Sequence, residues 1–139
     1  MSVIQSSAPE LYWLAATCLL SALLWLPYVV NRFQELGPPG WQWFPAPDPL
    51  PRAAWARRTM RAHLNAVENL VVFAPLALGV VIAGLGSPGT AWACRLYFCA
   101  RVAHYAVCWA GLPIVPRTLC FLAGVAAQLF LAATLLGAG

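Results

Sequence analysis

The stretch that decides the fold is RAAWARRTMRAHLNAVENLVVFAPLALGVVIAGLG, residues 52–86, in which an arginine-rich half runs directly into an apolar half. As one helix, about 35 residues would reach about 50 Å, which exceeds the roughly 30 Å hydrocarbon layer of a bilayer. The apolar half can therefore lie in a membrane, while the polar half must project beyond it or line a polar cavity. We expect this helix to cover residues 49–84, with Asp48 as its N-cap and Pro49 at its first position.

Three further stretches are long enough to be membrane helices, and they cover about residues 10–31, 88–110 and 116–136. A proline-rich loop, residues 33–51, follows the first, and Ser87 is expected to cap the third. The whole chain of 139 residues is 62% apolar and 9% charged, with a mean hydropathy of +0.74. These values exclude an ordinary soluble domain and predict an all-α integral membrane protein, a single four-transmembrane-helix bundle over residues 1–139.

Composition also excludes several kinds of chemistry. All eight basic residues are arginines, so no lysine is present for Schiff-base chemistry, and four acidic residues are too few for a two-carboxylate hydrolase. The five cysteines lie in apolar runs without a CxxC pair, which predicts neither a disulfide framework nor a metal site. The arginines form no basic stripe beside exposed aromatic residues, so we expect no nucleic-acid partner.

The arginines also predict an orientation. The first and third connections and their flanks hold five arginines, whereas the tails and the second connection hold none. By the positive-inside rule, both termini of this multi-pass protein should face away from the cytoplasm. The short connections favour a bacterial inner membrane.

Polar side chains gather on the second expected helix. Arg61, Asn65 and Glu68 are spaced i, i+4, i+7, which places them within about 60° of one face. A cation, an amide and an anion on one face can bind a zwitterion. The alternative is an ion pair that holds the bundle together, and the spacing does not decide between the two.

The third expected helix carries a second group. Arg101, His104, Tyr105 and Cys108 lie within about 100° of one another, while Arg95 falls about 120° from Arg101 and should face elsewhere. Ionisable residues in a membrane span are costly unless they face the bundle interior or a wet cavity, so Arg101 and His104 are candidates for function. A hydrogen-bonded structural role is the alternative for His104, and snorkelling or a helix–helix bond is the one we expect for Arg95.

Arg117 and Thr118 fall in the first turn of the fourth expected helix. A guanidinium, a hydroxyl and the positive end of the helix dipole would stabilise a thiolate there. An arginine at this level could equally anchor the helix to lipid phosphates.

Two short motifs carry a family resemblance. The run RTMRAHLNAVEN, residues 58–69, and the run RVAH, residues 101–104, are followed by Arg117, sixteen residues after Arg101. This pattern within a four-span hydropathy profile resembles the MAPEG family, the membrane-associated proteins of eicosanoid and glutathione metabolism. The resemblance covers about residues 11–136.

The resemblance implies a left-handed four-helix bundle that assembles as a homotrimer. It also implies a glutathione site between neighbouring subunits, open to the cytoplasm, with Arg117 stabilising the thiolate with help from Thr118. The residues that would hold glutathione are Arg61, Asn65, Glu68, Arg101, His104 and, by its position alone, Arg32. Family synthases carry hydroxyls at two positions where this chain has Cys108 and Phe121, and Tyr105 and Tyr97 are the nearest candidates to replace them.

Three functions are open at this point. The leading one is a glutathione-dependent transferase or peroxidase acting on a lipophilic electrophile that enters from the bilayer between the first and fourth helices. The second is a non-catalytic lipid-binding scaffold of MAPEG type, which the absence of hydroxyls at Cys108 and Phe121 favours. The third is a small transporter, although its polar lining should run through the membrane, whereas these polar residues gather toward one side.

Overall fold

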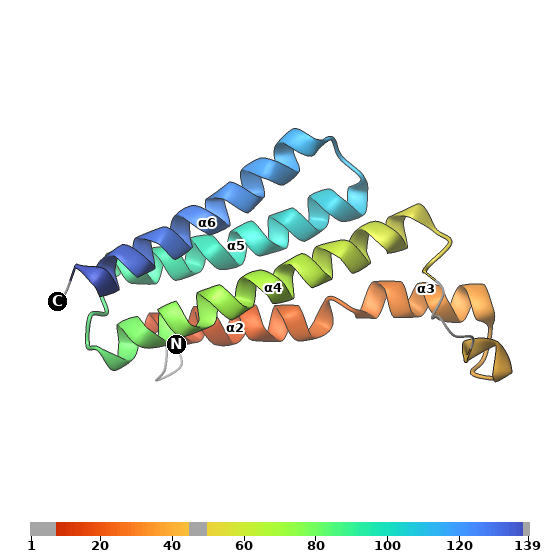
Figure 1. Ribbon diagram of the computed structural model, residues 1–139, viewed down its shortest axis with the longest axis horizontal. Helices are drawn as coiled ribbons and strands as arrows, with labels where there is room; N and C mark the ends of the chain where they lie inside the picture. Colours follow the sequence, from red (N-terminus) through yellow and green to blue (C-terminus); the bar gives the residue numbers. More distant parts are fainter. Residues whose placement is uncertain (1–7, 45–49, 138–139) are drawn as a thin grey trace.

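A computed structural model describes residues 8–44 and 50–137, and every regular element in these ranges is helical (Figure 1). The elements are α2 (Pro9–Leu23), α3 (Leu26–Leu36), a 3-10 turn η1 (Trp41–Trp43), α4 (Ala54–Ile82), α5 (Pro88–Ala110) and α6 (Ile114–Leu136). The helices run roughly parallel to the long axis of an elongated bundle, and α3 extends it at one end. The all-helical class predicted from composition is confirmed.

The core of the bundle forms around α5, which packs against α6, α4 and α2. Phe73 of α4 and Tyr97 of α5 are fully buried and stack face to face, with ring centroids 3.8 Å apart and planes 6° from parallel. Leu14, Ala127 and Leu131 belong to the same buried cluster. Every long helix therefore contributes to one apolar core away from the arginine-rich end.

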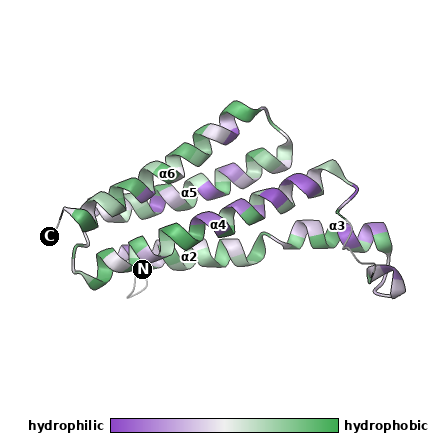
Figure 2. Cartoon of the chain, viewed as in Figure 1, coloured by the Kyte–Doolittle hydropathy of each residue, from purple (hydrophilic) through white to green (hydrophobic). Residues whose placement is uncertain are grey.

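Three helical segments are long and apolar enough to cross a membrane: Pro9–Leu36, Ala54–Ile82 and Ile114–Leu136. Only 22% of the most apolar window of each is buried within the chain. The remaining expected span, residues 88–110, forms α5, which has a suitable length but a hydropathy lowered by Arg95, Arg101 and His104. Figure 2 shows hydrophilic positions concentrated along the first half of α4 and on the facing part of α5.

The first span departs from the single helix expected over residues 10–31. It consists of α2 and α3, separated at Leu24 and Trp25. Pro27 explains the interruption, because it has no N–H to donate to the carbonyl four residues earlier and its ring clashes with that carbonyl. Tyr105 of α5 donates its hydroxyl to the Leu24 carbonyl at 2.9 Å and so stabilises the bend.

The second helix begins at Ala54, later than the predicted residue 49, and Ala53 is its N-cap. Ala53 has no capping side chain, so the Glu35 carboxylate accepts the backbone N–H groups of Arg52 and Ala53 at 2.9 and 3.0 Å. Pro51 favours an extended conformation at Leu50, the residue before it, so the helix begins only after this point. The predicted cap Asp48 lies outside the described residues.

The proline-rich segment 33–51 is also less irregular than expected. Its first residues continue α3 to Leu36, and Trp41–Trp43 form a 3-10 turn. Trp43 lies against Phe33, with ring centroids 4.7 Å apart, and donates its indole N–H to the Gly37 carbonyl at 3.2 Å. Gly37 has a φ of 73°, a conformation that favours glycine and turns the chain after α3.

The predicted cap of the third helix is confirmed. The side chain of Ser87 accepts the Thr90 N–H at 3.2 Å, and the Thr90 hydroxyl accepts the Ser87 N–H at 2.7 Å, which completes a capping box. The same Thr90 hydroxyl donates to the buried carboxylate of Glu10 at 2.5 Å, so the start of α5 is fixed to the start of α2. The helix ends at Gly111, whose φ of 71° is left-handed.

Candidate functional site

A pocket of about 350 Å³ lies where α4 begins, α5 ends and α6 begins. This volume is within the range of small-molecule sites. Five predicted site residues line it together: Arg61, Asn65, His104, Arg117 and Thr118. The other lining residues are Arg58, Ala62, Cys108, Gly111, Leu112 and Phe121.

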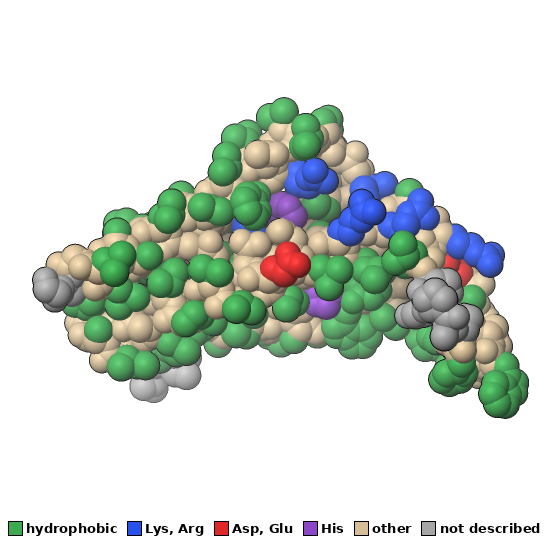
Figure 3. All heavy atoms as spheres, in the orientation of Figure 1, with side chains coloured by type: hydrophobic (Ala, Val, Ile, Leu, Met, Phe, Trp, Pro, Cys, Tyr) green, Lys and Arg blue, Asp and Glu red, His purple; other side chains and the backbone are tan. Residues whose placement is uncertain are grey.

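The pocket is strongly cationic. Arg58, Arg61 and Arg117 line it, and no acidic residue is among its lining residues in the described part of the chain. Within the described ranges, Arg61 and Arg117 have no hydrogen bond or ion pair. Figure 3 shows the arginines gathered at this end of the molecule. Guanidinium groups without protein partners are available to bind an anionic ligand.

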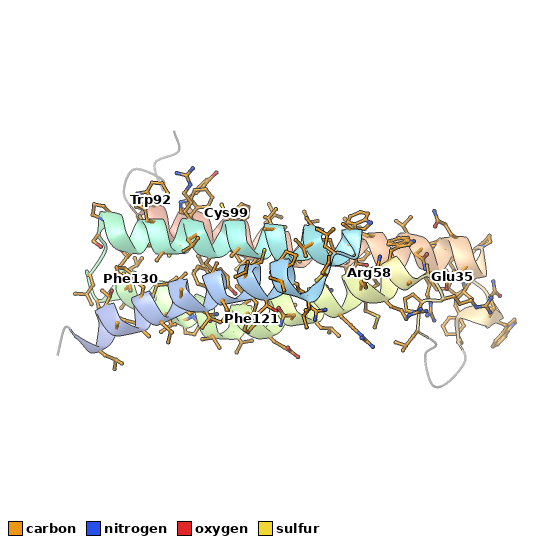
Figure 4. All side chains as sticks on the ribbon, turned by 90° about the horizontal axis from the view of Figure 1, so that it is seen from above. Glu35, Arg58, Trp92, Cys99, Phe121 and Phe130 are labelled. Atoms are coloured by element: carbon orange, nitrogen blue, oxygen red, sulfur yellow. The ribbon has the colours of Figure 1, made fainter. Side chains whose placement is uncertain are left out.

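Arg58 connects two of the helices that form the pocket (Figure 4). Its Nε donates to the Cys108 carbonyl at 2.9 Å and its Nη2 to the Trp109 carbonyl at 3.1 Å, which satisfies two carbonyls at the C-terminal end of α5. A Cβ on Gly111 would come within 2.9 Å of this guanidinium. Arg58 was not among the predicted site residues, although its spacing to Arg61 and Asn65 places it on the same face of α4.

Arg101 lies beneath the pocket and is 2% exposed. Its guanidinium donates to Asn65 Oδ1 at 3.2 Å and to the Phe121 carbonyl at 3.4 Å, and it lies 5.2 Å from the Tyr97 ring centroid. A Cβ on Gly124 would collide with this guanidinium. Arg101 thus joins α4, α5 and α6 and positions Asn65, a pocket residue, instead of lining the pocket itself.

His104 and Cys108 form the α5 wall of the pocket. Both are buried, at 7% and 8% exposure, and Cys108 Sγ lies 3.9 Å from His104 Nε2. Tyr105 and Tyr97 do not line the pocket, because Tyr105 bonds to Leu24 and Tyr97 stacks in the core. Neither tyrosine therefore brings a hydroxyl into the pocket to replace those absent at Cys108 and Phe121.

A helix that began at residue 116, as predicted, would place Arg117 and Thr118 beside its first free N–H groups. In the structure these two residues lie one turn further into α6. The helix begins at Ile114, and the Thr118 hydroxyl donates to the Ile114 carbonyl at 2.9 Å. Any anion held here is therefore bound by the Arg117 side chain and not by the free N–H groups of the helix end. Thr118 is available chiefly as a hydrogen-bond acceptor.

Glu68 and Arg32 do not line the pocket of the single chain. Glu68 is exposed one turn beyond Asn65 and has no hydrogen bond or ion pair within the described ranges. The next residue of α4, Asn69, is joined to α6, because Gln128 donates to the Asn69 carbonyl at 3.0 Å. This contact lies below the pocket. Arg32 lies on α3, with its guanidinium 5.9 Å from the Trp43 ring centroid.

Arg95 lies away from the pocket, as its angular position predicted. It is exposed, and its guanidinium lies 4.7 Å from the Trp92 ring centroid and 5.8 Å from that of Trp13. Over residues 8–44 and 50–137, no three His, Cys, Asp or Glu side chains come close enough together to hold a metal ion.

These features define a helical membrane protein with a cationic small-molecule pocket at one end of its bundle. The MAPEG family model matches residues 11–137, and the chain belongs to this family. The family includes glutathione-dependent transferases and peroxidases as well as non-catalytic members. No curated protein and no solved structure matches the chain significantly.

Proposed function

We propose that this protein is a glutathione-dependent transferase or peroxidase that acts on lipophilic electrophiles in a membrane. The observation that carries the proposal is the pair of unpaired guanidinium groups, Arg61 and Arg117, in a pocket without acidic lining residues. Glutathione carries two carboxylates and a thiol, so its chemistry fits this set of donors. Members of the family commonly use glutathione.

The polar residues predicted from the sequence have distinct roles in this proposal. Arg61 and Asn65 hold a carboxylate end of the tripeptide, and Arg101 positions Asn65 through their hydrogen bond. Bound glutathione would supply a nucleophilic sulfur. Arg117 stabilises the thiolate form of that sulfur, and Thr118 and His104 lie beside it in the pocket.

Electrostatics makes the role of Arg117 quantitatively reasonable. Lowering a thiol pKa by two units requires about 2.7 kcal/mol of preferential thiolate stabilisation. A guanidinium about 4 Å from a thiolate contributes about 4 kcal/mol at an effective dielectric constant of 20. One arginine is therefore sufficient, and the reaction needs no metal.

We propose that the chain assembles as a homotrimer, and exposed Glu68 supports contact with a neighbouring copy. Its carboxylate is exposed about 21 Å along α4 from the start of that helix at Ala54, within a membrane-spanning segment. A charge facing lipid at this depth is costly, so a polar partner should cover it. A second copy of the chain provides that cover, and it would bring Glu68 and Arg32 toward the glutathione site from a neighbouring subunit. Family members are typically trimers.

The distribution of the arginines along the chain supports one orientation of the protein in the membrane. We infer that α5 also spans the membrane, that the pocket faces the cytoplasm of a bacterial inner membrane and that both termini lie on the opposite side. We also propose that the motifs at 58–69 and 101–104 are of the kind found in microsomal prostaglandin E synthase.

Turnover of a chromogenic electrophile such as 1-chloro-2,4-dinitrobenzene, and of cumene hydroperoxide, tests the enzymatic proposal. We expect glutathione-dependent turnover by the purified protein and at least a hundredfold loss in Arg117→Gln, with Arg95→Gln as a matched control outside the pocket that retains activity. Equal turnover by the two variants would remove Arg117 from the reaction.

A lipid-binding scaffold is the second candidate. Phe121 and Cys108 favour it, because the pocket lacks the two hydroxyls that family synthases present. This function predicts co-purified lipid and no turnover with either electrophile. Mass spectrometry of lipids extracted from the purified protein, together with the turnover assay, distinguishes the two functions.

A further inference from the structure

The pocket contains one feature that the proposed reaction does not use, the thiol of Cys108. Among the five cysteines, Cys108 alone lines the pocket. Cys18 and Cys99 are exposed on the outer surface of the bundle, and Cys94 belongs to the apolar core. Cys108 differs from these because a molecule bound in the pocket can reach its sulfur, and His104 and Arg117 line the same pocket.

His104 is placed to exchange a proton with this thiol. The two residues are one turn apart on α5, and Cys108 Sγ lies 3.9 Å from His104 Nε2. An imidazole at this position can accept the thiol proton and return it, as a general base and then a general acid. Arg58 fixes the backbone of the same turn through its 2.9 Å bond to the Cys108 carbonyl, so the thiol is held at the pocket wall.

We propose that Cys108 undergoes thiol–disulfide exchange with a low-molecular-weight disulfide, such as oxidised glutathione, bound in this pocket. The inference rests on the proposed thiol-binding function and adds a second, protein-borne sulfur to the same site. It assigns to Cys108 a covalent role at a position where family synthases carry a hydroxyl.

The exchange is balanced without any further oxidant. His104 accepts the proton of Cys108, and the resulting thiolate attacks one sulfur of the bound disulfide. A new bond forms between Cys108 and that sulfur while the original disulfide bond breaks. The released thiolate is stabilised by Arg117 and takes up the proton from His104. Cys108 is oxidised to the mixed disulfide, and half of the incoming disulfide is reduced to a thiol.

Intact-protein mass spectrometry tests this proposal directly. The detergent-purified protein is incubated with oxidised glutathione, and peptide mapping locates the adduct. We expect a glutathionyl group on Cys108 that forms at a rate saturating with disulfide concentration, whereas any adduct on exposed Cys99 should form at a rate that does not saturate. Cys108→Ser should lose this adduct and Cys99→Ser, its control on the same helix, should retain it. His104→Gln should slow adduct formation at least tenfold.

Protection by a non-reactive ligand shows whether Cys108 is modified by a disulfide bound in the pocket or by random collision with disulfide in solution. S-methylglutathione should slow modification of Cys108 at least tenfold and leave modification of exposed Cys99 unchanged. Unmodified Cys108 beside modified Cys99 would overturn the proposal, and so would modification of Cys108 that S-methylglutathione does not slow. Size-exclusion chromatography of each variant shows that it is folded.

A separate measurement distinguishes failure of this inference from failure of the proposed function. Thiolate absorbance on titration with reduced glutathione reports binding without any involvement of the Cys108 disulfide. If that signal is present in the wild-type protein and Cys108 stays unmodified, the exchange is wrong and the glutathione site stands. If the signal is absent and Cys108 is not protected, both are wrong.

Discussion

Replacing Gly124 by alanine adds one methyl group next to Arg101, and so tests whether this arginine joins the helices beneath the pocket. A Cβ there would collide with the guanidinium of Arg101, which is 2% exposed and cannot move outward into solvent. Gly124→Ala must therefore displace a group that bonds Asn65 Oδ1 at 3.2 Å and the Phe121 carbonyl at 3.4 Å. The substitution should disturb both the stability of the bundle and the position of Asn65.

The expected cost follows from three contributions. Hydrogen bonds to a charged group are worth about 1.5 to 3 kcal/mol, and overpacking costs about 1 to 3 kcal/mol. Replacing glycine by alanine within a helix returns about 1 kcal/mol. The net loss in the free energy of unfolding is about 1.5 to 5 kcal/mol, which for a chain of this size lowers Tm by on the order of 10 °C.

Thermal unfolding in detergent, followed by circular dichroism, measures this effect. Gly79→Ala is the matched control, because the Cβ there meets only the flexible apolar tip of Leu135 at 3.1 Å. Its free energy of unfolding should stay within about 1 kcal/mol of wild type. If Gly124→Ala unfolds at the wild-type temperature, Arg101 does not occupy the position that links α4, α5 and α6.

Three further substitutions test other contacts. Glu35→Gln removes the charge that caps α4, so the Arg52 and Ala53 amides should exchange hydrogen about tenfold faster; unchanged exchange would mean that Glu35 is not the cap. Tyr105→Phe removes the hydrogen bond at the α2–α3 bend and should cost about 1 kcal/mol in thermal unfolding, whereas no loss would show that the bend is held by Pro27 alone. Glu68→Gln should reduce the trimer fraction on crosslinking in mild detergent, and an unchanged fraction would exclude Glu68 from the subunit contact.

Local signals in the sequence predicted the start and end of α5 correctly. Ser87 and Thr90 form their capping box within four residues, and Gly111 terminates the helix with its own backbone conformation. Such features depend only on neighbouring residues, so they can be read from the chain. The bend at Pro27 was not predicted, because hydropathy alone indicates a continuous apolar span. Hydropathy does not reflect that proline has no backbone N–H to donate.

Contacts between segments that are distant in the sequence could not be predicted from neighbouring residues. Glu35 caps a helix that begins 19 residues later, and Arg58 bonds to carbonyls 50 and 51 residues away. Helical spacing placed Arg61, Asn65 and Glu68 on one face of α4, but only the packing of α5 and α6 determines where the pocket ends along that face. The chain therefore encodes which residues share a face, and the bundle determines which of them share a cavity.

Ultraviolet difference absorbance of the detergent-purified protein, titrated with glutathione at several pH values, shows whether the pocket binds glutathione as a thiolate, because a thiolate absorbs where a thiol does not. We expect a saturable thiolate signal with a pKa below that of free glutathione, lost in Arg117→Gln and retained in Arg95→Gln. An intact protein that gives no thiolate signal, or an Arg117→Gln variant that gives the wild-type signal, would contradict the account.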